Sequence, residues 1–467
     1  MRIHHLALAL GVLAVGACKD ANAPDLNNPS VTDFSTITNL TQVQALATGV
    51  LRGDRGQATN EINFGETLGR DGYRVTASEP RTVTELLGPA IDPSDFLGGA
   101  IWPYANIRLA NIGIDGINAA AAGVMSDAER NASVGFLQTL KALEYMRIIE
   151  TRDSLGAPID VDIPPTGPLA PFSCKSDVLN YIASLLDSAA TSLSQGGNSF
   201  PFVLPDGFAG FDAPPTFLMF NRGLAAKVDI YIAFRNYAAS GTIDQVALTA
   251  AQTALTQSFV DTVNAANLNV GPLHTFSTST GDATNGLFDT YIRANPRVVN
   301  EADAGDARVP AAIDSGATAA VGGTAPPELV SSYWIYKIYP TPTSPVAILT
   351  NKELVLMLAE VEWGQGNLAG ATALANFTRT HLGELPPFTV GTAGTVLDNI
   401  LYEKRYSLLW QSADRWIDAR LFGKLNGNDP PAGVGMERGY APLGAFPIPF
   451  AESDARGGDV SQQCTSP

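Results

Sequence analysis

The sequence is poor in the residues that catalysis and metal binding use most often. It has four His and three Cys in 467 residues, and two of the His stand at positions 4 and 5. The other two, His274 and His381, belong to no HExxH sequence, and no GxSxG motif, P-loop or CxxC occurs. These absences disfavour a Ser-His-Asp hydrolase, a P-loop enzyme and a His- or Cys-based metal site. We expect no cofactor and no metal, His381 at the end of a helix, and His274 in a loop.

Long apolar runs are also scarce. No segment after the first 17 residues has 18 consecutive apolar residues, so none is predicted to span a membrane. The apolar run of ten from Leu6 to Val15 is too short for a bilayer core of about 30 Å and is typical of a secretory signal peptide. The following Val15-Gly16-Ala17-Cys18 resembles a bacterial lipobox, in which the Cys thiol is joined to lipid. We predict a signal peptide over 1–17 and lipidation of Cys18; the alternative is an ordinary export signal with a chance Cys.

The remaining chain shows no convincing interdomain linker. Residues 18–40 are polar and rich in turn formers, and are predicted to be the lipidated tether. One helical domain is expected over 41–467, with halves of about 41–240 and 241–467, and long surface loops over 196–216 and 315–328. If Cys18 carries lipid, Cys174 and Cys464 are left, either as one disulfide or as two buried thiols.

Basic residues are outnumbered by acids. The chain has 29 Lys and Arg against 46 Asp and Glu, a formal net charge of −17. This excess argues against nucleic acid as a partner, because phosphate binding depends on Lys and Arg. It also disfavours long-range attraction of anionic polymers, although a local Arg cluster overrides this.

Apolar residues recur at helical spacing along most of the chain, and alternating strands are rare. Within 42–51, for example, the apolar residues fall on one helical face. The same spacing predicts helices over 101–119, 133–150, 177–194, 221–237, 245–267, 352–363, 368–382 and 395–411.

Two stretches, 224–255 and 353–383, each indicate a helix, a turn and a second, Ala-rich helix. This plan resembles a tetratricopeptide repeat, although no period of about 34 residues extends over the chain. We predict a mostly α protein, built from tetratricopeptide-like helix pairs with irregular loop-rich inserts.

Residues 403–423, "EKRYSLLWQSADRWIDARLFG", combine charges with two Trp. Arg405, Arg415 and Asp418 are suited to charge-assisted hydrogen bonds that fix the last helices. Trp416 and Phe422 would fill the space beneath them. We interpret this segment as a structural corner of the fold and not as a working site.

Four segments together resemble the SusD/RagB family of outer-membrane nutrient-binding lipoproteins. They are the Cys18 lipobox, "IWPYANIRLANIGIDGI" with "FLQTLKALEYMRIIETRDSLGAPI", "NKELVLMLAEVEWGQGNLAGATALANFTR", and "ILYEKRYSLLWQSADRWIDARLFG" with "FPIPFAESDAR". Their order spans essentially the mature chain. The last segment is the most specific, although Lys404 stands where Arg is frequent and Ser412-Ala413 where Glu-Gly is frequent.

The resemblance implies a SusD-like fold and a lipid-anchored, surface-exposed protein of the outer membrane. Such a protein binds a glycan or oligosaccharide nutrient, is not an enzyme, and delivers its ligand to a SusC-type TonB-dependent transporter. Two alternatives remain: a helical-repeat adaptor that binds a protein partner, and a glycoside hydrolase that uses two carboxylates. Carbohydrate binding would exclude the adaptor, and product release from polysaccharide would identify the hydrolase.

Aromatic residues outside helical stripes are the candidates for ligand binding. Sugars stack their C–H faces on flat rings while polar groups fix the hydroxyls. Several rings crowd into "SSYWIYKIYP", which also contains Tyr339, and others precede a predicted helix. Core packing is the alternative for each ring, and Tyr333, Ile335 and Lys337 also alternate as in a short strand. The candidates are Trp334, Tyr333, Tyr336, Trp102, Tyr104 and Arg74.

Overall fold

The computed structural model describes residues 34–164, 166–324, 329–425, 432–458, 460 and 464. The predicted signal peptide 1–17, the lipidation site Cys18 and most of the tether 18–40 lie outside these residues, so they stay predictions. Within the described residues, no helix has both the length and the apolar character that crossing a membrane requires.

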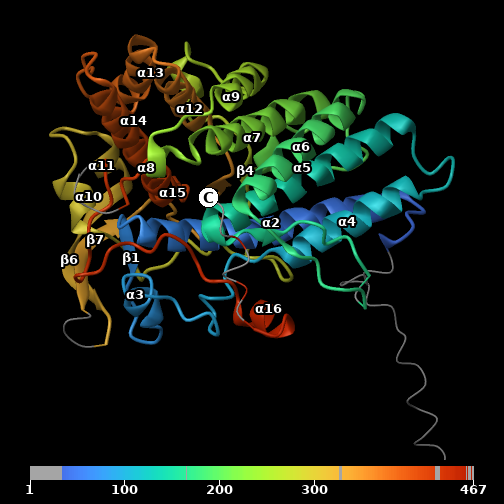
Figure 1. Cartoon of the computed structure of the whole chain (residues 1–467), viewed down its shortest axis with the longest axis horizontal. Coiled ribbons are helices and arrows are strands. Elements are labelled where there is room, and N and C mark those ends of the chain that lie inside the picture. Colours follow the sequence, from blue (N-terminus) through green and yellow to red (C-terminus); the bar gives the residue numbers. More distant parts are fainter. Residues whose placement is uncertain are drawn as a thin grey trace, which may run out of the picture.

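Helices dominate the fold and pack on one another largely in chain order. In the N-terminal part α2 contacts α4 and α5, and the series continues through α6, α7 and α9. In the C-terminal part α12 packs on α13 and α13 on α14. Figure 1 shows the long helices of the first half lying side by side. The predicted mostly α fold of helix pairs is confirmed. The long helices are α2 (Leu40–Leu68), α4 (Tyr104–Asn118), α5 (Asp127–Arg152), α6 (Lys175–Ser194), α7 (Pro214–Phe234), α9 (Gln245–Gln257), α12 (Asn351–Gly364), α13 (Leu368–His381) and α14 (Ala393–Ser407).

Shorter helices connect these long ones or follow them. They are α3 (Arg81–Thr84), α8 (Tyr237–Ser240), α10 (Pro296–Asn300), α11 (Arg308–Ala312), α15 (Asp414–Leu421) and α16 (Phe450–Ala455), with 3₁₀ turns η2 (Asp153–Leu155), η3 (Asp206–Phe208) and η4 (Ala265–Asn267).

Two helix boundaries differ markedly from the predicted ones. The helix predicted over 42–51 continues to Leu68, and its C-terminal part is buried on several faces, so it lacks the one-sided pattern. The helix predicted over 245–267 ends at Gln257. There Asp261 accepts hydrogen bonds from the N–H groups of Val263 and Asn264, a turn that competes with helix.

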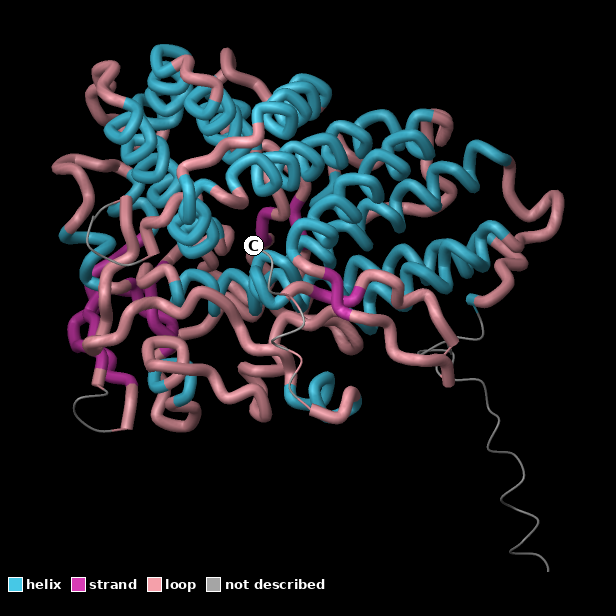
Figure 2. Tube along the Cα trace, viewed as in Figure 1, coloured by secondary structure: helices cyan, strands magenta, loops and turns pink. Residues whose placement is uncertain are grey.

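The strands are short and form antiparallel pairs beside the helices. β1 (Gly72–Arg74) pairs with β5 (Ile292–Ala294), β2 (Ala157–Pro158) with β3 (Phe172–Ser173), β4 (Leu273–His274) with β8 (Val346–Ala347), and β6 (Ile313–Gly322) with β7 (Val330–Tyr336). Figure 2 shows the β6–β7 pair at one end of the molecule.

Two predicted loops are therefore corrected. Residues 315–322 belong to β6, which is stabilised by pairing with β7. Their Ala- and Gly-rich sequence does not indicate a strand, because the pairing depends on the partner strand. His274 lies in β4 and is buried, with Nε2 2.6 Å from Oδ2 of Asp54. His381 ends α13, as predicted, and is exposed.

A disulfide joins the start of α6 to the C-terminal segment. Cys174 and Cys464 are bonded, with their Cα atoms 5.1 Å apart. Of the two alternatives that the sequence leaves open, the structure has the disulfide. Phe446 N–H also donates to Thr151 O, so the end of the chain lies against the N-terminal half.

Residues 403–423 form a structural corner, as predicted. The Arg405 guanidinium pairs with Asp71 at 2.7 Å and with Glu301 at 2.8 Å. Trp416 is fully buried, and its Nε1–H donates to a backbone carbonyl at 2.7 Å. Burial on all sides leaves these groups no access to a ligand.

Candidate functional site

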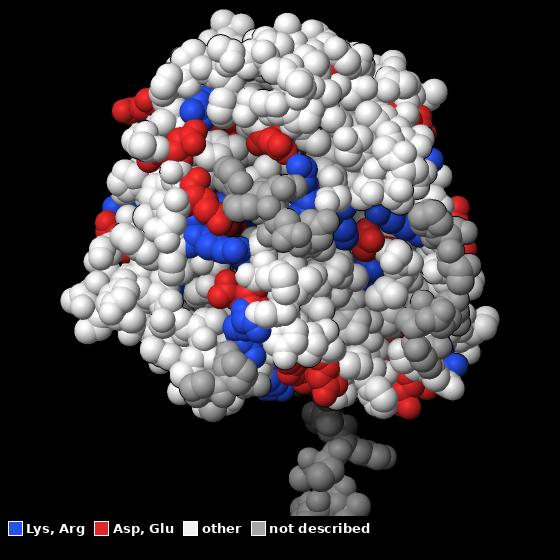
Figure 3. Space-filling model, turned by 60° about the vertical axis from the view of Figure 1, so that its left-hand side comes forward, with Lys and Arg blue, Asp and Glu red and all other residues white. Residues whose placement is uncertain are grey.

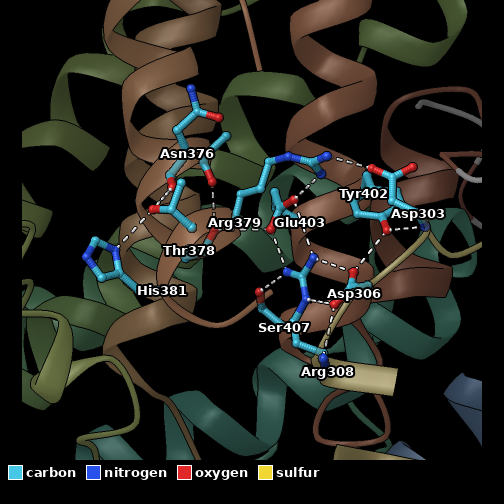
Figure 4. A network of polar contacts seen from close by, with 12 residues as sticks. Asp303, Asp306, Arg308, Asn376, Thr378, Arg379, His381, Tyr402, Glu403 and Ser407 are labelled. Carbon is cyan, nitrogen blue, oxygen red and sulfur yellow. Dashed lines mark hydrogen bonds and ion pairs between the residues drawn. The ribbon is translucent and has the colours of Figure 1, made fainter. Parts of the chain in front are cut away.

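A network of polar contacts among the C-terminal helices centres on the buried carboxylate of Glu403 (Figure 4). Arg308 and Arg379 both donate to the carboxylate of Glu403, and Arg308 also donates to Asp306 at 2.7 Å. The Tyr402 hydroxyl donates to Asp306 at 2.9 Å. Burial raises the pKa of Glu403, and the two guanidinium groups partly offset this. Because the carboxylates here are paired with cations, the network ties α11, α13 and α14 together and offers no free catalytic group.

The described part of the chain also contains no candidate metal-binding site. No group of three or more His, Cys, Asp or Glu side chains there is placed to hold a metal ion.

The aromatic residues predicted near β7 do not share one face. Tyr333 is 54% exposed, whereas its neighbour Trp334 is half-buried against an apolar cluster. Tyr336 stacks on Trp410 with ring centroids 4.7 Å apart, and its hydroxyl donates to Asp71 O. Tyr339 is buried. Of the four rings, Tyr333 is therefore the one most open to solvent.

Trp102 and Tyr104 lie in a different part of the fold, at the start of α4. Their rings are 4.9 Å apart, and the Tyr104 hydroxyl donates to Pro158 O at 2.8 Å. The Arg152 guanidinium lies 5.1 Å from the Trp102 ring. Tyr104 lines a cavity of about 270 Å³, but both rings are half-buried. In Figure 1, α4 extends toward the side of the molecule opposite β7.

Arg74 ends β1 and is held beside the start of β5. Its Nε–H donates to Oδ2 of Asp289 at 2.7 Å, and both side chains are partly exposed. Next to it, the N–H of Val75 donates to Tyr291 O at 2.9 Å. The side chain of Tyr291 is 50% exposed. The structure thus brings an open aromatic residue and a fixed ion pair to the same strand end.

The segment around α3 adds a second arginine and a second ring. The Arg81 guanidinium binds the carboxylate of Glu79 through two hydrogen bonds of 2.7 and 2.6 Å. It also lies over the exposed ring of Phe96, 4.7 Å from the centroid. The Thr82 hydroxyl donates to Arg74 O at 2.9 Å and so connects α3 to β1.

These contacts connect a set of residues that are all at least partly exposed, and we call the set the Arg74 surface: Arg74, Glu79, Arg81, Phe96, Asp289 and Tyr291. The hydrogen bond from Arg81 is the main cause that lowers the pKa of Glu79, and the charges of Arg81 and Arg74 add to it. The Arg74 surface therefore combines exposed aromatic rings with planar polar groups that ion pairs hold in place. Such a set can stack a flat apolar face and hydrogen-bond the groups around its edge.

Tyr333 lies in β7, which is next to the strands that carry the Arg74 surface. The hydroxyl of Ser332 in β7 donates to Ala294 O in β5 at 2.6 Å, and Ala294 is paired with Gly72 in β1. Of the predicted candidates, Arg74 and Tyr333 are therefore brought to neighbouring strands, whereas Trp102 and Tyr104 are not.

Tyr291 and Phe96 were not among the predicted site residues. Both lie in irregular segments, where apolar periodicity carries no information. The one available signal was composition, since "GLFDTYIR" places two aromatic residues around an acid.

The face that includes the β6–β7 end of the molecule carries charges of both signs (Figure 3). Among the described residues visible there, Lys and Arg side chains alternate with Asp and Glu, and no wide area has a single sign. This distribution does not favour a long anionic polymer as ligand.

Comparison with known proteins identifies the fold through structure and not through sequence. No protein-family model and no curated protein matches the chain. A SusD superfamily protein from Parabacteroides distasonis superposes with a TM-score of 0.67 at 14% identity, covering 90% of this chain and 98% of that one. A SusD-like carbohydrate-binding protein from Bacteroides fragilis gives 0.62 at 14%, covering 90% and 98%. A structure determined with a xylogluco-oligosaccharide gives 0.59 at 16%, covering 81% and 82%.

Proposed function

This chain has the SusD-like fold, and we propose that it is a carbohydrate-binding protein whose ligand is a glycan or oligosaccharide. The fold supports the proposal because structures similar to this chain include a SusD-like carbohydrate-binding protein and one determined with a xylogluco-oligosaccharide. The observation that carries it in this chain is the Arg74 surface, where Tyr291 and Phe96 are open to solvent beside fixed ion pairs.

The geometry of the Arg74 surface suits a neutral sugar. The guanidinium groups of Arg74 and Arg81 are already paired with Asp289 and Glu79, so their charge is largely compensated. Their remaining N–H groups and the carboxylate oxygens can exchange hydrogen bonds with hydroxyls. Exposed rings supply the stacking surface for the sugar C–H face.

The same pairing argues for binding without hydrolysis. A glycosidase needs one carboxyl group that is protonated at working pH, and the pKa of Glu79 is lowered instead. Glu79 is therefore not suited to be the general acid, and we propose that the chain is not an enzyme. The check is incubation with polysaccharide, in which release of shorter oligosaccharides would contradict this.

The binding test is calorimetric titration of the purified chain with xylogluco-, xylo- and malto-oligosaccharides. Tyr291→Ala and Arg74→Gln should each weaken binding of the best probe by about tenfold or more, equivalent to about 1.4 kcal/mol. His381→Ala removes an exposed ring from α13 and is the matched control, with unchanged affinity expected. The proposal would be overturned if the chain bound none of the three probes and nothing on a glycan array. Wild-type affinity in both Tyr291→Ala and Arg74→Gln would overturn it as well.

Anchoring and delivery complete the proposal. We propose lipidation of Cys18, attachment to the outer membrane, and transfer of the ligand to a SusC-type TonB-dependent transporter. Cys18→Ala should move the protein from the membrane fraction to a soluble or unprocessed form. Retention in the membrane with lipid label would reject the anchor. Failure of the tagged native protein to co-purify with a TonB-dependent transporter would reject the partner.

A further inference from the structure

A cavity of about 330 Å³ opens beside α2, and none of its lining residues belongs to the Arg74 surface. One wall is a single face of α2, formed by Thr48, Leu51, Arg52 and Arg55 at helical spacing. The other walls come from the segment around η3 and from the segment that contains β4. Figure 1 shows α2 and β4 near the middle of the molecule. The remaining lining residues are Val203, Pro205, Phe208, Leu273, His274, Thr275, Gly281 and Asp282.

The wall beside η3 is fixed to α2 by a side-chain amide. Gln44 accepts a hydrogen bond from the N–H of Val203 at 2.8 Å and donates to Val203 O at 3.1 Å. Gly207 in η3 approaches Leu273 so closely that a Cβ atom would lie 2.1 Å from its carbonyl oxygen. These contacts hold the cavity open without a ligand, which reduces the ordering cost of binding.

The wall around β4 is fixed as firmly. Arg55 donates to Thr275 O at 2.6 Å and pairs with Asp282. Behind this wall, His274 contacts Asp54, which pairs with the buried Arg147 at 3.0 Å. The polar groups at the back of the cavity therefore have partners within the protein.

Arg52 differs from Arg55 because it is an exposed residue, and its guanidinium has no hydrogen-bond or ion-pair partner among the described residues. The cavity lining holds two guanidinium groups, Arg52 and Arg55, against the one carboxylate of Asp282. Burial alone would raise the pKa of Asp282, but hydrogen bonds from Ala283 N–H and Arg55, with the charges of Arg55 and Arg52, lower it. The lining thus keeps a positive excess in a chain whose formal net charge is −17.

The remaining lining combines apolar and polar side chains. Leu51, Val203 and Phe208 form the apolar part, and Thr48 adds a hydroxyl. A cavity at the low end of the usual range for small-molecule sites suits a ligand of one or two sugar units. A guanidinium without a partner favours a carboxylate, which it can bind through two parallel hydrogen bonds.

We propose that this cavity is a second, acid-specific site that binds a uronate of one or two sugar units, with Arg52 holding its carboxylate. The assignment of a sugar, and not another carboxylate, rests on the proposed carbohydrate-binding function. The apolar side chains of the lining would contact the sugar C–H face, and Thr48 a hydroxyl. Because the contact is electrostatic and open to solvent, binding should weaken as salt is added.

The test is calorimetric titration of the full chain at low ionic strength with galacturonate and glucuronate. Galactose and glucose are the matched neutral probes, and hexanoate is a carboxylate without a sugar. We expect at least one uronate to bind about tenfold or more tightly than its neutral counterpart and than hexanoate. Arg52→Gln should reduce that affinity about tenfold or more, equivalent to about 1.4 kcal/mol.

Arg235→Gln is the control variant, because it also removes one positive charge but lies at the C-terminal end of α7, outside the cavity lining. Its affinity for uronate should equal that of the wild type. Arg52 is exposed, so Arg52→Gln should keep the wild-type melting temperature. The proposal would be overturned if no uronate binding were detected or if Arg52→Gln bound uronate with wild-type affinity. It would also be overturned if a neutral sugar or hexanoate bound as tightly as the uronate. Loss of oligosaccharide binding at the Arg74 surface is measured with other probes and other variants, so the two proposals can fail separately.

Discussion

At the residue scale, burial and pairing decide what each charged or aromatic side chain does. Arg405 is almost fully buried and is neutralised by Asp71 and Glu301, so it stabilises the fold. Arg52 is exposed and has no such partner within the part of the chain that the structure describes, so it is available to a ligand. The same residue type thus has opposite roles in the two positions.

Tyr333 and Trp334 provide a test of this distinction, because they are neighbours on opposite sides of β7. Tyr333→Ala removes an exposed ring and should weaken oligosaccharide binding with little change in melting temperature. Trp334→Ala leaves a gap in the cluster around Tyr402 and Leu409, so it should lower the melting temperature. The measurements are calorimetric titration and thermal unfolding of both variants. A stable Trp334→Ala that has lost binding, beside a Tyr333→Ala of wild-type affinity, would reverse the assignment.

Buried carboxyl groups make stability depend on pH. Burial raises the pKa of Glu150 to about 8, of Glu353 to about 7 and of Asp418 to about 8, although Lys227 and Lys404 lie close and oppose this. A carboxyl group with a raised folded-state pKa holds its proton more tightly in the folded chain. The contribution of such a group to the free energy of unfolding is therefore complete below its unfolded-state pKa, near 4. It is lost as the pH rises through the folded-state pKa values of about 7 to 8.

We expect the melting temperature to fall between about pH 6 and pH 8. Burial also lowers the pKa of Lys352 to about 8, which opposes the trend only at higher pH. Glu353→Gln removes one titrating group from the cluster and should make the pH dependence shallower. A melting temperature that rises over this interval would contradict the expectation.

At the element scale, short strands and turns position the candidate ligand groups. β1 has three residues, yet it joins α2 to the Arg74 surface and pairs with β5, which is more than 200 residues away in the chain. Helix α3 is tied to β1 by the Thr82 hydroxyl. Small irregular elements, supported by the helical scaffold, thus determine the geometry of the site.

Gly72 in β1 is the position where this packing is closest. A Cβ atom there would lie 2.3 Å from Cζ3 of Trp410 and 2.9 Å from Arg293 O. Gly72→Ala should therefore displace the Trp410 ring or β5, lower the melting temperature and weaken oligosaccharide binding together.

Gly56→Ala is the matched control for this change. Gly56 lies in α2, and a Cβ atom there meets nothing within 4 Å, so the variant should be neutral or more stable by about 0.5–1 kcal/mol. Equal melting temperatures for the wild type and Gly72→Ala would show that β1 and β5 are not packed as described.

At the scale of the whole molecule, the C-terminal segment connects distant parts of the fold. Phe446 and Phe450 donate backbone hydrogen bonds to Thr151 O and Pro93 O, both in the N-terminal half. Arg456 donates to Ala170 O at 2.7 Å. The disulfide between Cys174 and Cys464 then closes a loop of 290 residues in sequence separation.

Removing this disulfide should destabilise the chain by restoring freedom to the unfolded state. Cys464→Ser should lower the free energy of unfolding by about 2–4 kcal/mol, measured by denaturant titration. Cys174→Ser should have the same effect, and a reductant should lower the wild type to the level of the variants. An unchanged unfolding midpoint in Cys464→Ser would mean that the bond restrains only the end of the chain.

Helical periodicity, the scarcity of His and the clustering of charges in 403–423 are local properties, and they sufficed to predict a mostly α fold and a structural corner. A helix is stabilised by contacts within a few residues, so its signal is contained in a short window of sequence. The surface cannot be predicted in this way. Arg74 acquires Tyr291 as a neighbour only because β1 and β5, more than 200 residues apart, pair. Tyr333 rather than Trp334 faces solvent because Trp334 packs against a cluster that includes Tyr402 and Leu409 from a later segment of the chain. Exposure and charge pairing are long-range properties, and for this reason the tertiary structure alone decided which aromatic and arginine side chains a ligand can reach.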